Sequence, residues 1–380
     1  MQHKSKLEKV TIMADEQTQK AGDNAQPIQA DTVIIAGIDE KRVREIFAEM
    51  FAIERRNLTA EAGIVADTRV AEFENELMPK MIAADALKAF GDPGFQILLR
   101  KAQLAAAATE RPNDYELLSE LLIHRFQKGD NRNTRAGITR AVEIIDQIND
   151  DALLGLTVFH SATYFLPATS DIFQGLDLLN DLFEKIVYDT LPTGNEWIDH
   201  LDVLDAIRIL PFGKIKKFTE YYPLQLVNYI NQGIKISSDN YNKANEILIK
   251  VGFSQEALIP HALNPDYVRL NISKAEIENS MLLTKITQNG QIIQKQYPTT
   301  KEQKEALYAV FELYSDDNNI KNNNITKLME EIEKRQYLKL VKDWWDSINA
   351  SFQITSVGKV LAHTNAQRID KNLPYFRLIV

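Results

Sequence analysis

The sequence predicts a mainly α-helical fold: an irregular helical array with a short N-terminal β segment and a small C-terminal helical unit. Amphipathic segments recur roughly every 20 residues between Gly91 and Leu210. Turn-forming Pro, Gly, Asn and Asp residues separate them. Strand-like runs are too few for a doubly wound sheet or a barrel. The helices predicted in this region are Phe95–Thr109, Asp114–Gln127, Thr134–Ile148, Ala152–Phe165, Asp171–Tyr188 and Glu196–Ile209.

The composition is that of an ordinary globular protein. The length is sufficient for two or three domains, or for one extended helical array. The chain has 380 residues, 44% of them hydrophobic and 26% charged. Its net charge of −9 argues against a large nucleic-acid footprint. The lack of cysteine excludes disulfide scaffolds, thiolate metal sites and cysteine nucleophiles, and it fits a cytoplasmic protein. The most apolar run, Leu153–Leu166, is shorter than the roughly 20 residues of a membrane span, so we expect a buried helix there.

The N-terminal region predicts a polar tail followed by an assembly segment. Residues 1–21 are charged and polar, and Met13 offers an alternative start to Met1. Residues 22–38 open on a Gly-Asp-Asn turn and continue into a β-like run that needs a partner strand. That partner is either the chain's own body or another copy. The residues predicted to mediate assembly, here and in the helix that follows, are Ile28, Val33, Ile34, Ile35, Val43, Ile46, Phe47 and Met50.

A long amphipathic stripe follows at residues 39–83. Asp39 is the predicted N-cap, and Pro79 is expected to end or kink the stripe. Its length corresponds either to one helix of about 60 Å or to two helices. The stripe does not sustain the strict heptads of a coiled coil.

Two larger regions complete the predicted organisation, a helical array at residues 84–270 and a C-terminal helical domain at 271–380. Ser273 and Glu276 form a capping box that favours a helix from Lys274 to about Gln288. The alternative is a β-hairpin over 274–297 that turns at Asn-Gly. The Asn-rich stretch 315–324 predicts a loop. The sequence ITSVGKVLA near the end is similar to the LTxxG tail of winged-helix domains, so residues 300–368 are a candidate unit of that kind.

No stretch carries a recognised catalytic motif. A P-loop, GxGxxG, GxSxG and HExxH are all missing from the sequence. Glu120 and His124, four residues apart on a helix, are candidate metal ligands, and so is the acidic run from Asp199 to Asp205. A surface helix contact and a solvated acidic face explain these residues better. No catalytic, cofactor-binding or metal-binding residue is therefore assigned, and no cofactor is expected.

One short segment interleaves cations with aromatic residues, as surfaces that bind single-stranded nucleic acids do. Phosphate attraction and base stacking require this combination. The alternative is an amphipathic helix end with buried rings and solvated lysines, which we favour. The candidate contact residues are Lys214, Lys216, Lys217 and Tyr221.

Several segments resemble those of a family of uncharacterised bacterial proteins. They are GDNAQPIQA, VIIAGIDEKRVREIFAEMF, GDPGFQILLRKAQLAAA, TRAGITRAVEIID and IPHALNPDYVRLN. The resemblance covers most of the chain from about Gly22 and implies a GDN(S)-type turn and a Gln-Ala strand before a mostly helical body. It implies no catalytic residues. Ala25 stands where many such segments have Ser. GDNS-type segments also open bacterial proteins that look like phage-defence components.

We therefore expect a non-enzymatic cytoplasmic bacterial protein that forms a homo-oligomer through its N-terminal segment and binds another protein. A sensor or scaffold in anti-phage defence fits this description. The first alternative is a nucleic-acid-binding protein or regulator that uses the C-terminal tail or the Lys214–Lys217 patch. The second is a nuclease effector whose acidic residues are scattered through the sequence.

Overall fold

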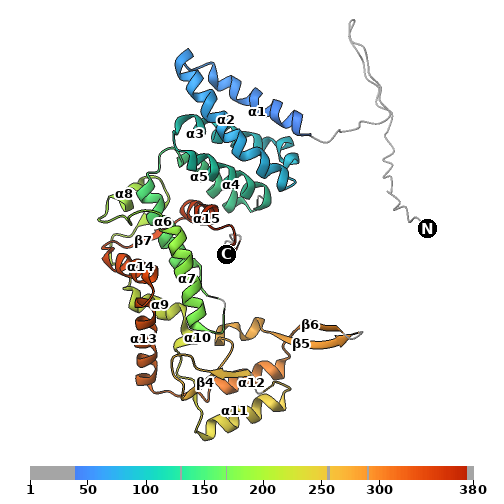
Figure 1. The fold of residues 1–380 in the computed structure, drawn as a ribbon, viewed down its shortest axis with the longest axis vertical. Helices are drawn as coiled ribbons and strands as arrows, with labels where there is room; N and C mark the ends of the chain where they lie inside the picture. Colours follow the sequence, from blue (N-terminus) through green and yellow to red (C-terminus); the bar gives the residue numbers. More distant parts are fainter. Residues whose placement is uncertain (1–38, 129–130, 168, 255–256, 289–290, 375–380) are drawn as a thin grey trace, which may run out of the picture.

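A computed structural model describes residues 39–128, 131–167, 169–254, 257–288 and 291–374. Helices dominate this part of the chain, and its strands form three small antiparallel sheets, so the predicted mainly α class is confirmed. The molecule is elongated, with a helical bundle at one end, a middle layer of helices and a smaller α/β unit at the other end (Figure 1). No helix in these ranges has both the length and the apolar character needed to cross a membrane.

The N-terminal stripe forms two helices, which was one of the two predicted arrangements. α1 (Glu40–Arg55) begins after the predicted N-cap Asp39, whose carboxylate accepts a backbone hydrogen bond. α2 (Ala60–Ala83) continues through Pro79, so this proline does not end the stripe. Met81, beyond the proline, is fully buried, and packing of this kind outweighs the backbone hydrogen bond that proline removes.

The bundle contains helices from both ends of the described chain. Its members are α1, α2, the 3-10 helix η1 (Leu87–Gly91), α3 (Pro93–Ala108), α4 (Pro112–Lys128), α5 (Arg132–Ile144) and α15 (Ser356–Ile369). α15 packs against α4, α5 and α6 (Asp150–Tyr164). The predicted helices of this region match α3 to α6 within a few residues.

The middle layer continues the array and carries the first sheet. Its helices are α6, α7 (Ile172–Ile186), α8 (Glu196–Val203), α9 (Phe218–Gln225), α10 (Val227–Ile230), α13 (Asn318–Glu333) and α14 (Gln336–Ser347). β1 (Ile207–Ile209) pairs antiparallel with β7 (Phe352–Ile354). The loop predicted at residues 315–324 is shorter than expected. α13 starts at Asn318, and Asn324 within it is completely buried.

Residues 234–314 form the smaller α/β unit, which has a hydrophobic core of its own. Its elements are β2 (Ile234–Lys235), α11 (Asp239–Lys250), β3 (Leu258–Pro260), β4 (Tyr267–Leu270), the 3-10 helix η3 (Lys274–Asn279), β5 (Met281–Gln288), β6 (Gln291–Pro298) and α12 (Lys301–Phe311). β4 lies between β2 and β3 in an antiparallel sheet. This core crosses the predicted boundary between residues 84–270 and 271–380.

The preferred helix from Lys274 to Gln288 is wrong, and the alternative hairpin is right. The capping box at Ser273 and Glu276 is present, but η3 ends at Asn279. β5 and β6 then pair in register from Met281↔Pro298 to Gln288↔Gln291. Thr and Ile residues favour strands, and an Asn-Gly turn joins strands two residues apart, so the local signals for a hairpin outweigh the cap.

The residues proposed as a winged-helix unit do not gather into one. α12 belongs to the α/β unit, α13 and α14 contact α7, and α15 joins the N-terminal bundle. The Thr-x-x-Gly pattern has a different explanation here. Thr355 caps α15 by accepting the Gly358 N–H at 3.2 Å, and Gly358 is small enough to cross the Ala206 carbonyl.

Candidate functional site

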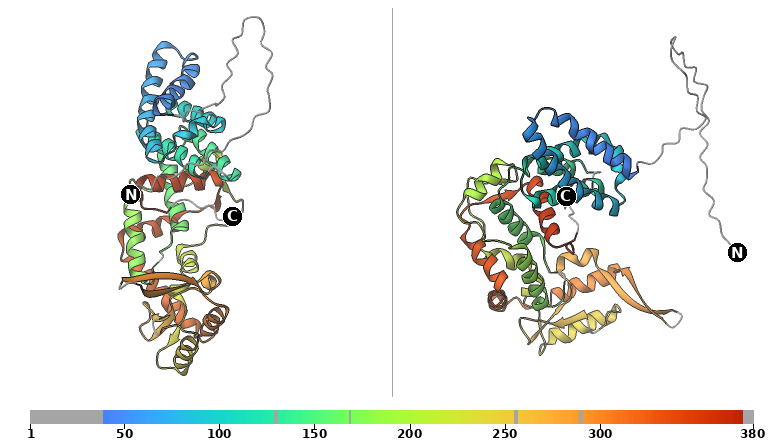
Figure 2. Two further views of the ribbon diagram at one scale, coloured as in Figure 1. Left: turned by 90° about the vertical axis from the view of Figure 1, so that its right-hand side faces the viewer. Right: turned by 45° about the horizontal axis from the view of Figure 1, so that its top comes forward.

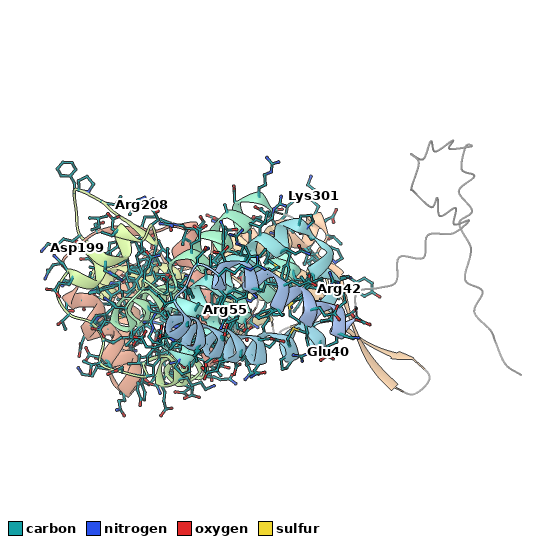
Figure 3. The ribbon with its side chains drawn as sticks, turned by 90° about the horizontal axis from the view of Figure 1, so that it is seen from above. Glu40, Arg42, Arg55, Asp199, Arg208 and Lys301 are labelled. Atoms are coloured by element: carbon teal, nitrogen blue, oxygen red, sulfur yellow. The ribbon has the colours of Figure 1, made fainter. Side chains whose placement is uncertain are left out.

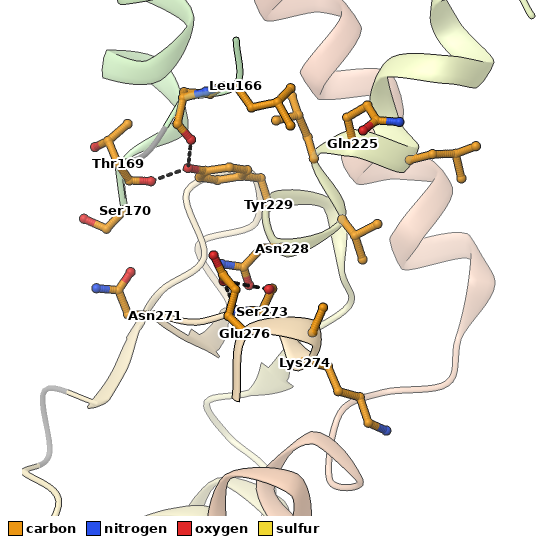
Figure 4. A pocket seen from close by; sticks show the side chains of 15 residues that line it. Leu166, Thr169, Ser170, Gln225, Asn228, Tyr229, Asn271, Ser273, Lys274 and Glu276 are labelled. Carbon is orange, nitrogen blue, oxygen red and sulfur yellow. Dashed lines mark hydrogen bonds between the residues drawn. The ribbon is translucent and has the colours of Figure 1, made fainter. Parts of the chain in front are cut away.

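A pocket of about 710 Å³ lies where the middle layer meets the α/β unit. Its walls come from the segment between α6 and α7, from α9 and α10, and from the residues that follow β4 and begin η3 (Figure 4). No sequence pattern indicates this pocket, because these three segments are far apart in the chain. A concave site with apolar walls and a few polar groups is the usual form of a binding site.

Arg269 fixes the pocket's walls from below the surface. Its side chain is only 1% exposed. Its Nη2 donates to the Ser170 carbonyl at 2.7 Å and its Nη1 to the Leu270 carbonyl at 3.1 Å. The guanidinium also lies 5.1 Å from the centre of the Tyr229 ring. Burial lowers the pKa of Arg269, and no described carboxylate pairs with it, so these carbonyls and the ring carry its stabilisation.

Tyr229 holds the same segment before α7 in place. Its hydroxyl donates to the carbonyls of Thr169 and Pro167, as Figure 4 shows. In the amide orientation that satisfies both neighbours, Asn228 accepts from Arg269 Nη1 at 3.0 Å and donates to the Ile272 carbonyl at 3.1 Å. The pocket is thus built on a hydrogen-bonded frame that joins α10, β4 and the residues before α7.

One side of the pocket is apolar and the other is polar. Leu166, Leu224 and Val227 are 39%, 53% and 50% exposed, respectively, which is unusual for three large apolar side chains around one opening. On the polar side Glu276 accepts from the N–H of Ser273 at 2.9 Å and from its hydroxyl at 2.6 Å. The site can therefore seat an apolar side chain and hydrogen-bond to a backbone beside it.

The predicted assembly residues fall into two groups. Ile28, Val33, Ile34 and Ile35 lie outside the described residues. Val43, Ile46 and Phe47 are buried in the chain's own core, and Met50 is partly buried against it. The Phe47 carbonyl also accepts a hydrogen bond from the buried Gln103 at 2.8 Å. The apolar face of α1 therefore serves the bundle.

Most rings of the lysine and aromatic segment are buried or half-buried, and two of its lysines contact the end of α14. Phe218 and Tyr222 are buried, and the half-buried Tyr221 lies 5.1 Å from the ring centre of Trp345. Lys214 donates to Asn349 at 3.4 Å and Lys217 to the Asp346 carbonyl at 2.5 Å. These lysines sit at the C-terminal end of α14, where cations satisfy helix carbonyls.

Lys216 is exposed, and its carbonyl accepts the Trp345 indole N–H at 2.8 Å. Trp344 and Trp345 are both buried, so neither of them faces a neighbouring molecule. Phe218, Tyr221 and Tyr222 pack against the chain itself, so they do not form an open stacking platform for bases, whereas Phe212, two residues before Lys214, is 89% exposed.

The candidate metal ligands are engaged in other ways. Glu120 accepts from Lys371 at 2.7 Å and pairs with Lys80 at 3.0 Å, whereas His124 Nδ1 lies 3.0 Å from the Thr364 hydroxyl. Burial opposes the charged form of Glu120, but the two lysines outweigh it and lower its pKa. No group of three or more metal-ligating side chains occurs in the part of the chain that the structure describes.

In the acidic run at α8, Asp202 and Asp205 make contacts within the chain, and Asp199 is exposed. Asp205 pairs with Arg208 at 2.7 Å and Arg140 at 3.3 Å, and Asp202 accepts the Ile209 N–H at 3.0 Å. Figure 3 places Asp199 and Arg208 on the side of the molecule opposite to Glu40 and Arg42 at the start of α1. These contacts hold the turn between α8 and β1 and join it to α5.

Two buried polar clusters were missed by sequence reasoning. His160 Nε2 lies 3.3 Å from His363 Nδ1 between α6 and α15. In the second cluster, His261 Nε2 lies 2.8 Å from the Asn231 carbonyl, and the Asn324 amide donates to the same oxygen at 2.9 Å. A histidine in an apolar run was visible in the sequence, but its partner was not.

Comparison with known proteins identifies a family and gives no individual relative. No curated protein and no solved structure matches the chain. A family model with the description “-like” matches residues 37–379, which leaves the GDNAQPIQA segment outside the match. The match spans the whole described region, and the chain belongs to this “-like” family.

Proposed function

We propose that this protein is a non-enzymatic scaffold that assembles through its N-terminal segment and binds another protein in the pocket beside Arg269. The observation that carries the proposal is the exposed apolar rim of Leu166, Leu224 and Val227 beside a rigid polar wall. The occupant we propose is an extended peptide segment with an apolar anchor residue. Its anchor fills the apolar side, and its backbone meets the polar groups of the opposite wall.

A peptide-display library tested on the full chain addresses this binding role. We expect selected peptides to share an apolar anchor and to bind the variant Leu224→Asp/Val227→Asp about tenfold more weakly or worse, because a buried apolar contact is replaced by a charge. Val203→Asp is the matched control, since Val203 is 78% exposed and lies outside the pocket. Peptides that bind both variants equally well would contradict the pocket as the binding site.

The assembly role rests on residues 22–38. These residues contain a β-like run in need of a partner, while the apolar face of α1 is occupied inside the bundle. Light scattering of the full chain and of a chain that starts at Asp39 tests this role. We expect a defined oligomer for the full chain and a monomer for the shortened one. Equal masses per particle, counted in chains, would end the assembly proposal.

A role in anti-phage defence remains part of the proposal. Its support is the similarity of the Gly22–Ala30 segment to those that open bacterial defence-like proteins. The binding role does not depend on it.

A further inference from the structure

The β5–β6 hairpin is a sheet with two open edges. Its strands pair only with each other among the described residues. Figures 1 and 2 show the hairpin projecting from the α/β unit. A two-stranded sheet is marginally stable by itself, and an open edge presents unpaired N–H and C=O groups that a further strand can bind.

The base of the hairpin is held firmly, so the projection is a built feature of the unit. The hydroxyls of Ser280 and Thr299 lie 2.7 Å apart, and the Thr299 N–H donates to the Ser280 carbonyl at 3.2 Å. Ser280 follows η3 and Thr299 precedes α12, and both elements contribute to the core of the unit. The base of the hairpin is therefore anchored to the core of the α/β unit.

The charges of the hairpin and of the N-terminal segment are complementary. Residues 281–298 contain Lys285 and Lys295 and no acidic residue, in a chain of net charge −9. Residues 22–38 contain Asp23 and Asp31 and no basic residue. Residues 28–38 also lack proline, so they are able to donate a full row of backbone hydrogen bonds.

We infer that residues 28–38 of one copy add as a third strand to an edge of the β5–β6 hairpin of a second copy. This inference rests on the proposed assembly role and identifies the surface that receives the N-terminal segment. Eleven extended residues span roughly 36 Å, more than the eight residues of β5 or β6 require. α1 lies in the bundle and the hairpin lies in the unit at the opposite end (Figure 1). Such a contact joins copies head to tail and closes into a ring or extends into a filament.

The test uses two complementary variants of the protein. The donor variant keeps its N-terminus, and residues 282–297 are replaced by an Asn-Gly turn between Met281 and Pro298, which already face each other. The acceptor variant starts at Asp39 and keeps the hairpin. We expect each variant alone to be monomeric and their mixture to form a 1:1 complex by light scattering. An unchanged circular dichroism spectrum verifies that each variant is folded.

The outcomes separate this inference from the assembly role. If the donor variant alone still forms the full-length oligomer, the inference falls and the assembly role stands. A mixture that stays monomeric also overturns the inference. If the unaltered chain is a monomer, the assembly role is contradicted, and the inference that rests on it is contradicted as well.

A charge exchange tests the pairing without removing any strand. Lys285→Glu with Lys295→Glu in the acceptor should weaken the 1:1 complex about threefold to tenfold, and Asp23→Lys with Asp31→Lys in the donor should restore it. Equal affinity in all four combinations would contradict the pairing.

Discussion

His160 and His363 meet in the interior of the protein, with Nε2 of the first 3.3 Å from Nδ1 of the second, although 203 residues separate them in the sequence. The contact joins α6 to α15 and so helps to fix the last helix in the N-terminal bundle. Nε2 of His363 also lies 2.9 Å from the Pro374 carbonyl. Burial, with smaller contributions from nearby charges, lowers the pKa of His160 to about 3 and that of His363 to about 4.

Acid should therefore destabilise the protein through this pair. Well above pH 6.5 both imidazoles are neutral in the folded and unfolded states, so they contribute no pH dependence there. Below that pH the unfolded chain binds protons that the folded chain does not, and stability falls as the pH approaches 4. We expect urea unfolding to show a loss of about 2 to 4 kcal/mol between pH 7 and pH 5.

The variant His160→Gln isolates the contribution of one imidazole. Its free energy of unfolding should fall less steeply between pH 7 and pH 5, by up to about 1.4 kcal/mol per pH unit. An identical slope in the variant and the unaltered chain would show that acid acts elsewhere.

Replacing Gly358 by Ala should be among the most damaging small changes in the chain. A β-carbon at this position would overlap the carbonyl oxygen of Ala206, which belongs to the backbone and cannot rotate away. We expect Gly358→Ala to lower the free energy of unfolding by about 3 kcal/mol in urea titrations. The same substitution at Gly94 is the control, because the nearest atoms there lie 3.5 Å from the new carbon. Gly94→Ala should be neutral or stabilise by about 0.5 to 1 kcal/mol.

The regular helices were predictable because their signals are local. Apolar spacing and capping residues located α3 to α6 closely, and Asp39 marked the start of α1. The hairpin at 281–298 is harder to predict because the capping box at Ser273 favours a longer helix, whereas it starts only a short 3-10 helix. A cap indicates where a helix begins and gives no information about its length.

The candidate site could not be predicted from the sequence, for a different reason. Arg269, Ser170 and Tyr229 come from three separate parts of the chain, and only the folded packing brings them together. The same holds for the histidine pair. The basic–aromatic segment shows the opposite case, since the sequence already favoured buried rings and exposed lysines at 214–222.

Arg269→Lys should loosen the junction between the α/β unit and the middle layer. An ammonium group cannot donate to the carbonyls of Ser170 and Leu270 and also lie flat against Tyr229 as the guanidinium does. We expect a loss of about 1 to 3 kcal/mol in urea unfolding. Arg208→Lys is the control, because Arg208 is exposed and surface substitutions usually change stability by less than about 0.5 kcal/mol. Equal effects of the two variants would show that the buried guanidinium has no special role.

Tyr222→Phe and Tyr115→Phe should change stability in opposite directions. Tyr222 is fully buried and stacks on Phe218 at 4.4 Å, but its hydroxyl has no hydrogen-bond partner among the described residues. Burial also raises the pKa of this hydroxyl, which therefore stays protonated. The Tyr115 hydroxyl, also buried, donates to the Thr109 carbonyl at 3.2 Å.

The two substitutions remove the same atom from these different environments. Losing an unsatisfied hydroxyl removes its desolvation penalty, so Tyr222→Phe should stabilise the protein by about 1 kcal/mol. Losing a satisfied one leaves the Thr109 carbonyl with one hydrogen bond fewer, so Tyr115→Phe should cost about 1 kcal/mol. Urea unfolding of both variants at pH 7 measures the difference. Destabilisation by Tyr222→Phe would mean that this hydroxyl has a partner in solution, and an ordered water molecule at the site would then be the first to look for.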